Sequence, residues 1–500
     1  MSASQQKKLR KEQQAEGLEQ LTPLELQEAA SKKRSKVLIT ITCIILAVLI
    51  VVAAVFNSNL FYNKVAAAEI NGKTYSAAEV NYYYWTNYYT FCNTYGSYLS
   101  YMGLDTSLPL GDQQYSEDMT WEDYFKEQAK TTMIQIQSIC EEAKEAGFEL
   151  DEDALHEIEH SIEDLDATAE SAGFASVKQY LTAGYGKGMT EEIMRECLTD
   201  VYTANLYYQE IYESFTYTDE ELEEYYTENA DSFDYIDYSY YLVSAEADEE
   251  GNVSEDAMAA AKATADSIIA GVDSVETFEN HVAASGEDVS ATTTTTAGAS
   301  LNTNFAEWLL DDSRTAGDCT VIEVENSGCY VVYFSGRNNN HYPTVDVRHI
   351  LINAEANEDG EYTDEAKAEA KAKAEDLLAE WEAGDATEDS FAALANEHSE
   401  DSGSNTNGGL YETVYEGQMV EEFNDFCFAD GRTAGDTGIV YGTNGYYAGY
   451  HIIYFVGQSD VLYSSYIAEN ELRNEELNAW NAEKMESYTY TKKMADKYVG

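Results

Sequence analysis

The feature that most constrains this sequence is an internal repeat. Residues 236–257 (IDYSYYLVSAEADEEGNVSEDA) align without a gap with residues 345–366 (VDVRHILINAEANEDGEYTDEA). Further along, GCYVVYFSG at 328–336 matches GYHIIYFVG at 449–457. Because both copies keep one pattern from their first apolar run to their last, we expect two copies of a single folding unit in tandem.

Each copy predicts a domain of the α+β class. The apolar runs at its two ends alternate or run continuously, which is typical of strands. Between them lies an Ala-rich stretch with helical spacing, which in the second copy ends with Leu377 and Trp381 on one face. We therefore predict a first repeat at 231–337 and a second repeat at 344–458.

The parts of the chain on either side of the repeats show helical patterns. Residues 57–230 place apolar side chains at helical spacing, with capping signals such as Thr218 followed by Glu221 three positions later. Residues 459–500 return to a helical pattern. The sequence therefore predicts a helical domain at 57–230 and a C-terminal helical segment at 459–500.

The N-terminal part predicts a membrane anchor. Residues 1–36 are polar and end in SKKRSK, and residues 37–56 are 20 uncharged, mostly apolar residues. A helix of that length spans ~30 Å, the thickness of the hydrocarbon core. Because basic flanks stay in the cytoplasm, we expect residues 1–36 to be a cytoplasmic tail of a single-pass cell-membrane protein whose bulk is extracytoplasmic. A cleaved signal peptide begins in the same way and is the alternative.

Charge and cysteine content exclude several classes of function. The formal net charge of −64 repels nucleic-acid phosphates, so nucleic acid is not an expected partner. The seven cysteines form no CxxC pair and show no spacing typical of a metal site. We therefore expect no metal and no cofactor.

Two histidines lie near the ends of the second repeat. His349 is part of RHILI and His451 is part of YHIIYF, and both segments read as strands. Although about a hundred residues separate them, strands at the two ends of one domain can lie side by side in its sheet. An acidic turn and a Gly-Gly pair lie between the two histidines in the sequence.

These motifs together resemble a known family. In order along 345–457, RHILI, FAALA, SEDS, GGL, GQMVEEF and GYHII closely resemble parvulin-type (PpiC) peptidyl-prolyl isomerases. The upstream EINGKTYSAAEV region and the C-terminal helical segment resemble extracytoplasmic foldases and chaperones of the PrsA/SurA type. This resemblance implies that residues 57–230 are a SurA-like chaperone domain and that the second repeat is the isomerase domain.

The resemblance assigns roles to six residues of the second repeat. It implies a catalytic set of His349, Asp401 and His451 and a set that holds the proline ring, Leu410, Met419 and Phe423. The sequence departs from the family at Tyr411, where Gly is usual, and in a lengthened turn at 442–450. In the first repeat Tyr240 and Tyr330 stand at the histidine positions, so we expect that repeat to be a degenerate, inactive parvulin-like domain.

The chemistry of proline isomerisation fits these residue types. Rotation about an amide costs ~18–20 kcal/mol because resonance is broken, yet no bond is made or cut. A site of this kind therefore needs no nucleophile and no metal, but must bind the twisted amide better than either planar form. An apolar slot would hold the ring while polar groups surround the rotating carbonyl.

The sequence thus predicts an extracytoplasmic isomerase and chaperone, with two alternatives. Its expected partners are the membrane, through residues 37–56, and unfolded or newly secreted polypeptides that contain X-Pro bonds. One alternative is a non-catalytic holdase that binds unfolded chains. The other is a zinc peptidase acting through HEIEH at 156–160, which has the H-E-x-x-H pattern of a zinc helix. Its two histidines lie off the apolar stripe of that helix, which favours a chance match.

Overall fold

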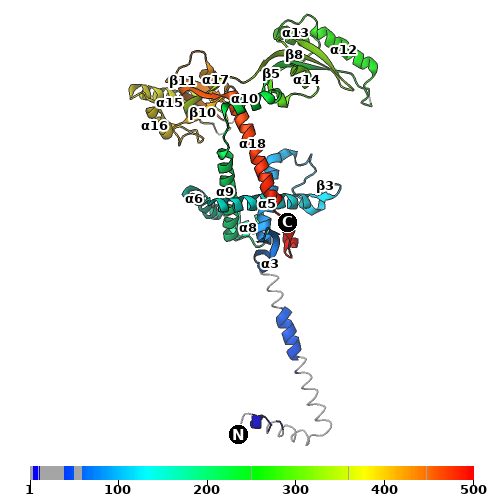
Figure 1. Ribbon diagram of the computed structural model, residues 1–500, viewed down its shortest axis with the longest axis vertical. Helices are drawn as coiled ribbons and strands as arrows, with labels where there is room; N and C mark the ends of the chain where they lie inside the picture. Colours follow the sequence, from blue (N-terminus) through cyan, green and yellow to red (C-terminus); the bar gives the residue numbers. More distant parts are fainter. Residues whose placement is uncertain are drawn as a thin grey trace. The chain divides into compact units, whose positions relative to one another are not determined.

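The computed structural model describes residues 4–8, 11, 36, 39–49, 59–248, 250–357, 360–445 and 447–500. The chain forms two compact units (Figure 1). The first consists of Met1–Phe215 with Glu476–Gly500, and the second of Thr216–Glu475. The second unit contains both repeats.

The first unit is mainly helical. Its main helices are α4 (Ala77–Tyr95), α5 (Trp121–Ala146), α6 (Glu152–Glu163), α7 (Leu165–Ser171), α8 (Val177–Tyr185) and α9 (Glu191–Ser214), with short helices α3 (Leu60–Asn63), η1 (Gly96–Tyr98), η2 (Leu110–Asp112) and η4 (Asp496–Tyr498). Its strands are β1 (Ala66–Ile70), β2 (Lys73–Ser76), β3 (Gln114–Ser116), β4 (Met119–Thr120) and β13 (Tyr490–Lys492). Strands β13, β1 and β2 form one small sheet, which ties the end of the chain to its first strand.

Aromatic side chains build the core of this helical unit. Trp121 and Phe125 on α5 are almost fully buried, and Tyr84 of α4 packs edge-on against Phe125 with ring centroids 6.3 Å apart. Phe91 lies 5.3 Å from Trp121 by the same measure. Edge-to-face packing of this kind is favoured between aromatic rings, so the many tyrosines of this unit serve as core residues as well as surface ones.

The two repeats have the same architecture. The first contains β5 (Tyr235–Ser244), α12 (Glu255–Ile269), α13 (Val275–Ala284), β6 (Thr292–Ala297), η3 (Gly298–Ser300), α14 (Ala306–Leu309), β7 (Cys319–Val324) and β8 (Gly328–Asn338). The second contains β9 (Pro343–Asn353), α15 (Asp364–Ala383), α16 (Glu388–His398), β10 (Leu410–Val414), α17 (Glu421–Phe428), β11 (Thr437–Thr443) and β12 (Ala448–Leu462). Their antiparallel sheets have the corresponding orders β6-β5-β8-β7 and β10-β9-β12-β11.

The sheet of the second repeat buries both of its faces. Ile350 and Ile352 of β9 point to the side covered by α15 and α16, whereas Val345 and Val347 point to the side covered by α17. Side chains alternate between faces along a strand, so even-numbered and odd-numbered residues of β9 belong to different cores. His349 is odd-numbered and lies on the α17 side.

The C-terminal segment differs from the predicted helical pattern at two places. Helices α10 (Asp219–Glu228), α11 (Ala230–Phe233) and α18 (Tyr463–Glu486) complete the structure. The segment predicted as helical from residue 459 begins instead with the end of β12, because Leu462 still pairs with Pro343 of β9. It also contains β13, whose Tyr490 pairs with Ile70 of β1.

The predicted membrane anchor is only partly described. Residues 39–49 are helical, and residues 37, 38 and 50–56 lie outside the described part of the chain. Within the residues that are described, no helix is both long enough and apolar enough to span a bilayer. The anchor therefore stays a prediction.

Two glycines of the second repeat give a test of the close packing between β10 and β9. Gly409 and Gly417 both have a positive φ, 71° and 84°. A Cβ on Gly409 would lie 2.2 Å from the His349 carbonyl oxygen, whereas a Cβ on Gly417 would meet nothing within 4 Å. Gly417→Ala should therefore cost only the left-handed backbone strain of ~1–2 kcal/mol. Gly409→Ala should cost about 3 kcal/mol or more, since backbone must also move.

Native-state hydrogen exchange of the β9 amides measures both losses in the full chain. Equal losses for the two variants would mean that β10 does not approach β9 as closely as described.

Candidate active site in the second repeat

Strand pairing brings the two predicted histidines together. His349 of β9 is opposite Ile453 of β12, and His451 is opposite Leu351. Both imidazoles therefore stand on the α17 side of the sheet. Their Nδ1 atoms are 3.2 Å apart, and the rings are stacked with centroids 5.4 Å apart. Both side chains are buried, at 5% and 6% exposure.

Asp401 lies at the far side of His349. It follows α16 in the loop that leads to Gly-Gly, and its Oδ2 accepts a hydrogen bond from His349 Nε2 at 2.9 Å. The Tyr411 hydroxyl, at 3.0 Å, and the Ser404 hydroxyl donate to the same oxygen. The His349 hydrogen bond, followed by those from Ser404 and Tyr411, holds the pKa of Asp401 well below its usual range.

The hydrogen-bond partners fix the direction of a chain of four groups. An ionised carboxylate only accepts, so the proton on His349 must sit on Nε2. With one proton on each imidazole, His349 Nδ1 then accepts from His451 Nδ1–H. His451 Nε2 is left as an acceptor, and the Tyr447 hydroxyl lies 3.0 Å from it as the donor. The chain therefore runs from Tyr447 through both histidines to Asp401.

Burial keeps His451 uncharged. Desolvation, with a smaller contribution from the neighbouring His349, lowers the pKa of His451 to about 3, and the attraction of Asp401 only partly opposes this. At neutral pH His451 therefore meets the ring of His349 as an uncharged imidazole. Gly442 leaves the space for this arrangement, since a Cβ there would lie 2.7 Å from His451 Nε2.

An apolar group packs against the histidine pair. Phe423 of α17 is 2% exposed, and its ring lies 5.5 Å from that of His349 and 5.4 Å from that of His451. Met419 is half-buried against the same core as Phe423 and Val347. Of the predicted proline-binding residues, the structure places Phe423 against both histidines and Met419 against the core that contains Phe423.

Leu410 does not join this group. It pairs with Arg348, whose number is even, so its side chain belongs to the opposite face of the sheet from His349. Tyr411 pairs with Val347 and packs in the same core as Met419, with its ring 5.3 Å from that of His349. The side chain that β10 supplies here is therefore one position later than the sequence motif indicated.

The first repeat contains the same arrangement of rings with different chemistry. The rings of Tyr240, Tyr330 and Phe305 lie 6.2, 5.4 and 5.3 Å apart in pairs. They correspond to His349, His451 and Phe423 in the second repeat. Tyr240 and Tyr330 therefore match His349 and His451 in their place in the structure as well as in the sequence. The imidazole hydrogen-bond chain has no counterpart among these rings.

Three residues of the network were missed by the sequence reasoning. Tyr411 was noted only as a departure from the family pattern, and Tyr447 lies in the lengthened turn before His451. Counting strand alternation forward from the Gly-Gly pair would have placed Leu410 and Tyr411 on opposite faces, which makes Tyr411 a candidate. Ser404 and Tyr447 lie in loops, where no periodicity predicts direction.

The histidines of the HEIEH motif are not part of a group of metal-binding side chains among the described residues. His156 and His160 lie on the exposed side of α6, and His160 Nδ1 is 3.0 Å from Asp164. Across the described residues, no three His, Cys, Asp or Glu side chains are grouped so as to hold a metal ion.

The segment that contains this site matches a known domain family. Residues 330–458 match the family model of the PPIC-type PPIase domain. This part of the chain is therefore a parvulin-type peptidyl-prolyl isomerase domain, as the motifs indicated. Among curated protein sequences none matches the chain.

Solved structures of foldases are similar to parts of the chain. They include the peptidyl-prolyl isomerase PrsA from Bacillus anthracis (19% identity, 30% of this chain and 59% of that one, TM-score 0.18). The foldase PrsA from Streptococcus pneumoniae is 14% identical over 77% of this chain and 88% of its own, with a TM-score of 0.23. A SurA-like chaperone of Campylobacter jejuni is 16% identical over 84% and 94%, with a TM-score of 0.13. The chain thus spans 59% of the length of the first of these.

The depressed pKa of His451 predicts loss of stability in acid. A histidine that stays neutral in the folded state takes up a proton more readily when unfolded, so its contribution falls as pH drops below the usual value of 6.5 and stops falling near 3. Between pH 7 and pH 5 the opening free energy of β9 and β12 should fall by about 2 kcal/mol. Asp401 adds a loss in the same direction at lower pH.

Hydrogen exchange at the two pH values measures this change, and the first repeat is the control. Its β5 and β8 carry Tyr240 and Tyr330 at the equivalent positions and should change little. A His451→Gln variant should lose most of the pH dependence in β9 and β12. An equal fall in both repeats would contradict the assignment to His451.

Proposed function

We propose that this protein is an extracytoplasmic peptidyl-prolyl cis-trans isomerase and chaperone that assists the folding of secreted polypeptides. The observation that carries the proposal is the buried chain from Tyr447 through His451 and His349 to Asp401, with Phe423 packed against both rings. It lies in the segment that matches the isomerase family.

The geometry supports catalysis by binding rather than by bond formation. Asp401 receives hydrogen bonds from His349, Ser404 and Tyr411, so its charge is already stabilised and it is a poor nucleophile. The oriented imidazoles and the apolar side chains offer a dry surface to a proline ring. Each ~1.4 kcal/mol by which such a surface prefers the twisted amide is worth tenfold in rate.

Location outside the cytoplasm is part of the proposal. The large apolar side chains of residues 39–49 are exposed to solvent, and Ile39, Ile44 and Leu49 are each more than half exposed. An apolar helix with no protein core around it is what a membrane anchor requires. The basic residues before it favour a cytoplasmic N-terminus.

A holdase function has an observation of its own. In the segment from 95 to 115 the first unit exposes large apolar side chains, and Tyr98 and Tyr101 are 67% and 87% exposed with ring centroids 6.4 Å apart. Leu108 is 53% exposed in the same segment. Exposed aromatic surface of this kind binds unfolded chains without requiring proline. This activity is compatible with catalysis in the second repeat.

Substitutions in the site should separate catalysis from chain binding. Met419→Ala and His451→Ala should each lower kcat/KM for proline-limited refolding by about tenfold, through loss of apolar contact and of the oriented imidazole pair. Leu410→Ala removes similar apolar surface from the opposite face of the sheet and should leave the rate nearly unchanged. His398→Ala, at the end of α16, is the matched histidine control.

The assay follows refolding of a protein limited by an X-Pro bond, with each variant's fold checked by circular dichroism. No acceleration by the unsubstituted protein, together with unchanged suppression of aggregation in all variants, would instead favour the holdase.

The anchor makes a separate prediction. After alkaline carbonate treatment the full chain should stay with the membrane, because a spanning helix is not held by charge alone. A chain that starts at residue 57 should be released. Protease added to the outer side of intact, wall-free cells should digest the second repeat and spare an epitope placed within residues 1–36. Protection of the second repeat would contradict the proposed topology.

A further inference from the structure

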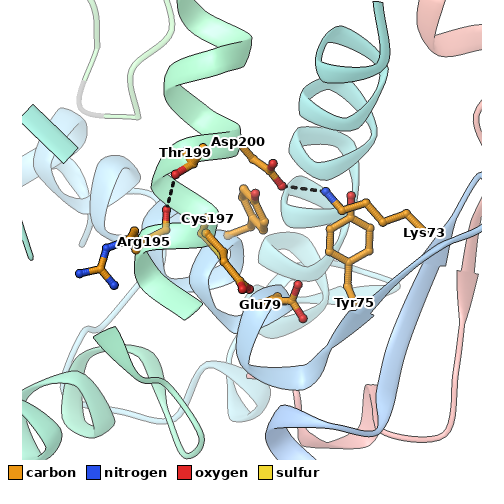
Figure 2. Close-up of a pocket in the computed structure, with 9 residues that line it drawn as sticks. Lys73, Tyr75, Glu79, Arg195, Cys197, Thr199 and Asp200 are labelled. Carbon is orange, nitrogen blue, oxygen red and sulfur yellow. Dashed lines mark hydrogen bonds and ion pairs between the residues drawn. The ribbon is translucent and has the colours of Figure 1, made fainter. Parts of the chain in front are cut away.

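The first unit contains a cavity that the isomerase does not use. It lies between β2, α4 and α9 and has a volume of about 330 Å³ (Figure 2). Tyr75 and Tyr83, with the thiol of Cys197, are its buried lining residues, at 4%, 3% and 3% exposure. Burial raises the pKa of the Cys197 thiol, which therefore contributes no charge.

The two cations beside the cavity are already paired. Lys73 Nζ is 2.8 Å from Asp200 Oδ2. Arg195 binds Glu159 through two hydrogen bonds of 2.8 and 3.2 Å, and Figure 2 shows its guanidinium directed away from the other labelled side chains. Neither cation is therefore available to neutralise the remaining acids of the cavity.

Two carboxylates that line the cavity have no cationic partner. Glu79 uses one oxygen to cap α4, accepting from the Ser76 amide at 2.7 Å. Glu196 makes no hydrogen bond or ion pair with any residue of the described chain. Burial and the nearby charges of Glu79 and Glu192 raise the pKa of Glu196, and the charge of Lys64 only partly opposes this. The cavity is thus lined by two carboxylates without a cationic partner and by the rings of Tyr75 and Tyr83.

Tyr83 supplies a second, independent indication of a ligand. Its phenol is buried, yet no group in the described chain forms a hydrogen bond with it. Tyr83 lines this cavity together with Tyr75, Cys197 and Asp200. The hydroxyl oxygen is not among the fully enclosed polar atoms that lack a partner, so a molecule that enters can reach it. A tyrosine whose ring is buried and whose hydroxyl stays accessible can hydrogen-bond to a ligand.

We propose that this cavity binds a cationic side chain, lysine or arginine, of an extended polypeptide. The aliphatic stem would pack between Tyr75 and Tyr83, and the charged head would reach Glu79 and Glu196 and donate to the Tyr83 hydroxyl. The cavity wall already accepts a cation, since Lys73 Nζ lies 5.1 Å from the centroid of the Tyr75 ring. Long basic side chains bury their stems and keep their charge near polar groups in this way.

This site is distinct from isomerisation, because it lies in the first unit and would bind a basic side chain instead of proline. It gives the chaperone part a chemical preference for basic segments. The net charge of −64 would draw such segments to the whole surface. The test must therefore separate the cavity from that general attraction.

The experiment measures the binding of short labelled peptides to the purified full chain by fluorescence anisotropy. The peptides are seven-residue Gly/Ser/Ala sequences without proline, with lysine, arginine or norleucine at the centre. Glu196→Gln should weaken binding of the lysine and arginine peptides about fivefold, the loss of one charge-assisted contact. Glu210→Gln makes the same charge change on the same helix roughly 20 Å away and should have little effect.

Tyr83→Phe adds a readout that a purely structural role would not give. Removing a hydroxyl that lacks a partner should keep or raise the melting temperature, yet it should lower affinity for the lysine peptide about threefold. Binding of either basic peptide that depends on Glu196 and Tyr83 in this manner supports the proposal. Equal weakening by Glu196→Gln and Glu210→Gln, or equal binding of the norleucine peptide, overturns it. The proline-limited refolding rate should be unchanged by these variants, so failure here is distinct from failure of the isomerase.

Discussion

The site of this protein depends on the register between β9 and β12. Pairing of His349 with Ile453 and of His451 with Leu351 sets two imidazoles on one face of a sheet, with their Nδ1 atoms 3.2 Å apart. Because side chains alternate, a slip of one residue would send one ring to the α15 side and leave the other without its partner. Gly409, just before β10, approaches the His349 backbone so closely that no side chain fits between them. This contact fixes β10 against β9.

Comparison of the two repeats separates the features of the three-ring group that the fold needs from those that only the second repeat has. Tyr240, Tyr330 and Phe305 reproduce the ring positions of the site with the same strand order, so three aromatic rings suffice to pack that side of the sheet. The histidines are therefore not required for the fold. What they add is a pair of rings whose hydrogen bonds have a direction, set by Asp401 at one end and Tyr447 at the other.

The sequence predicted the parts of the structure that obey a period. The repeat, the strands that carry His349 and His451, and the helical 57–230 region all followed from apolar spacing. Leu410 was misplaced because the motif was matched by residue type, whereas the face of a strand residue is decided by its pairing; Tyr411 faces the site instead. Tyr447 and Ser404 point inward from loops, where the direction of a side chain depends on contacts made after folding. The unpaired Glu196 was equally invisible, since a missing partner can be recognised only when the neighbours are known.

A division of labour between the two units follows from how isomerisation is catalysed. Contacts with parts of a polypeptide far from the rotating bond are the same in the cis, twisted and trans forms, so they lower KM without raising kcat. The exposed tyrosines near Tyr101 and the acidic cavity beside Glu196 can act only in this uniform way. Preference for the twisted amide must come from groups that touch the proline and its neighbouring carbonyl, which under the proposed function are those around Phe423 and the two histidines. A client held by the first unit would raise the concentration of X-Pro bonds near the second repeat, and the chemistry of rotation would remain the task of the imidazole pair.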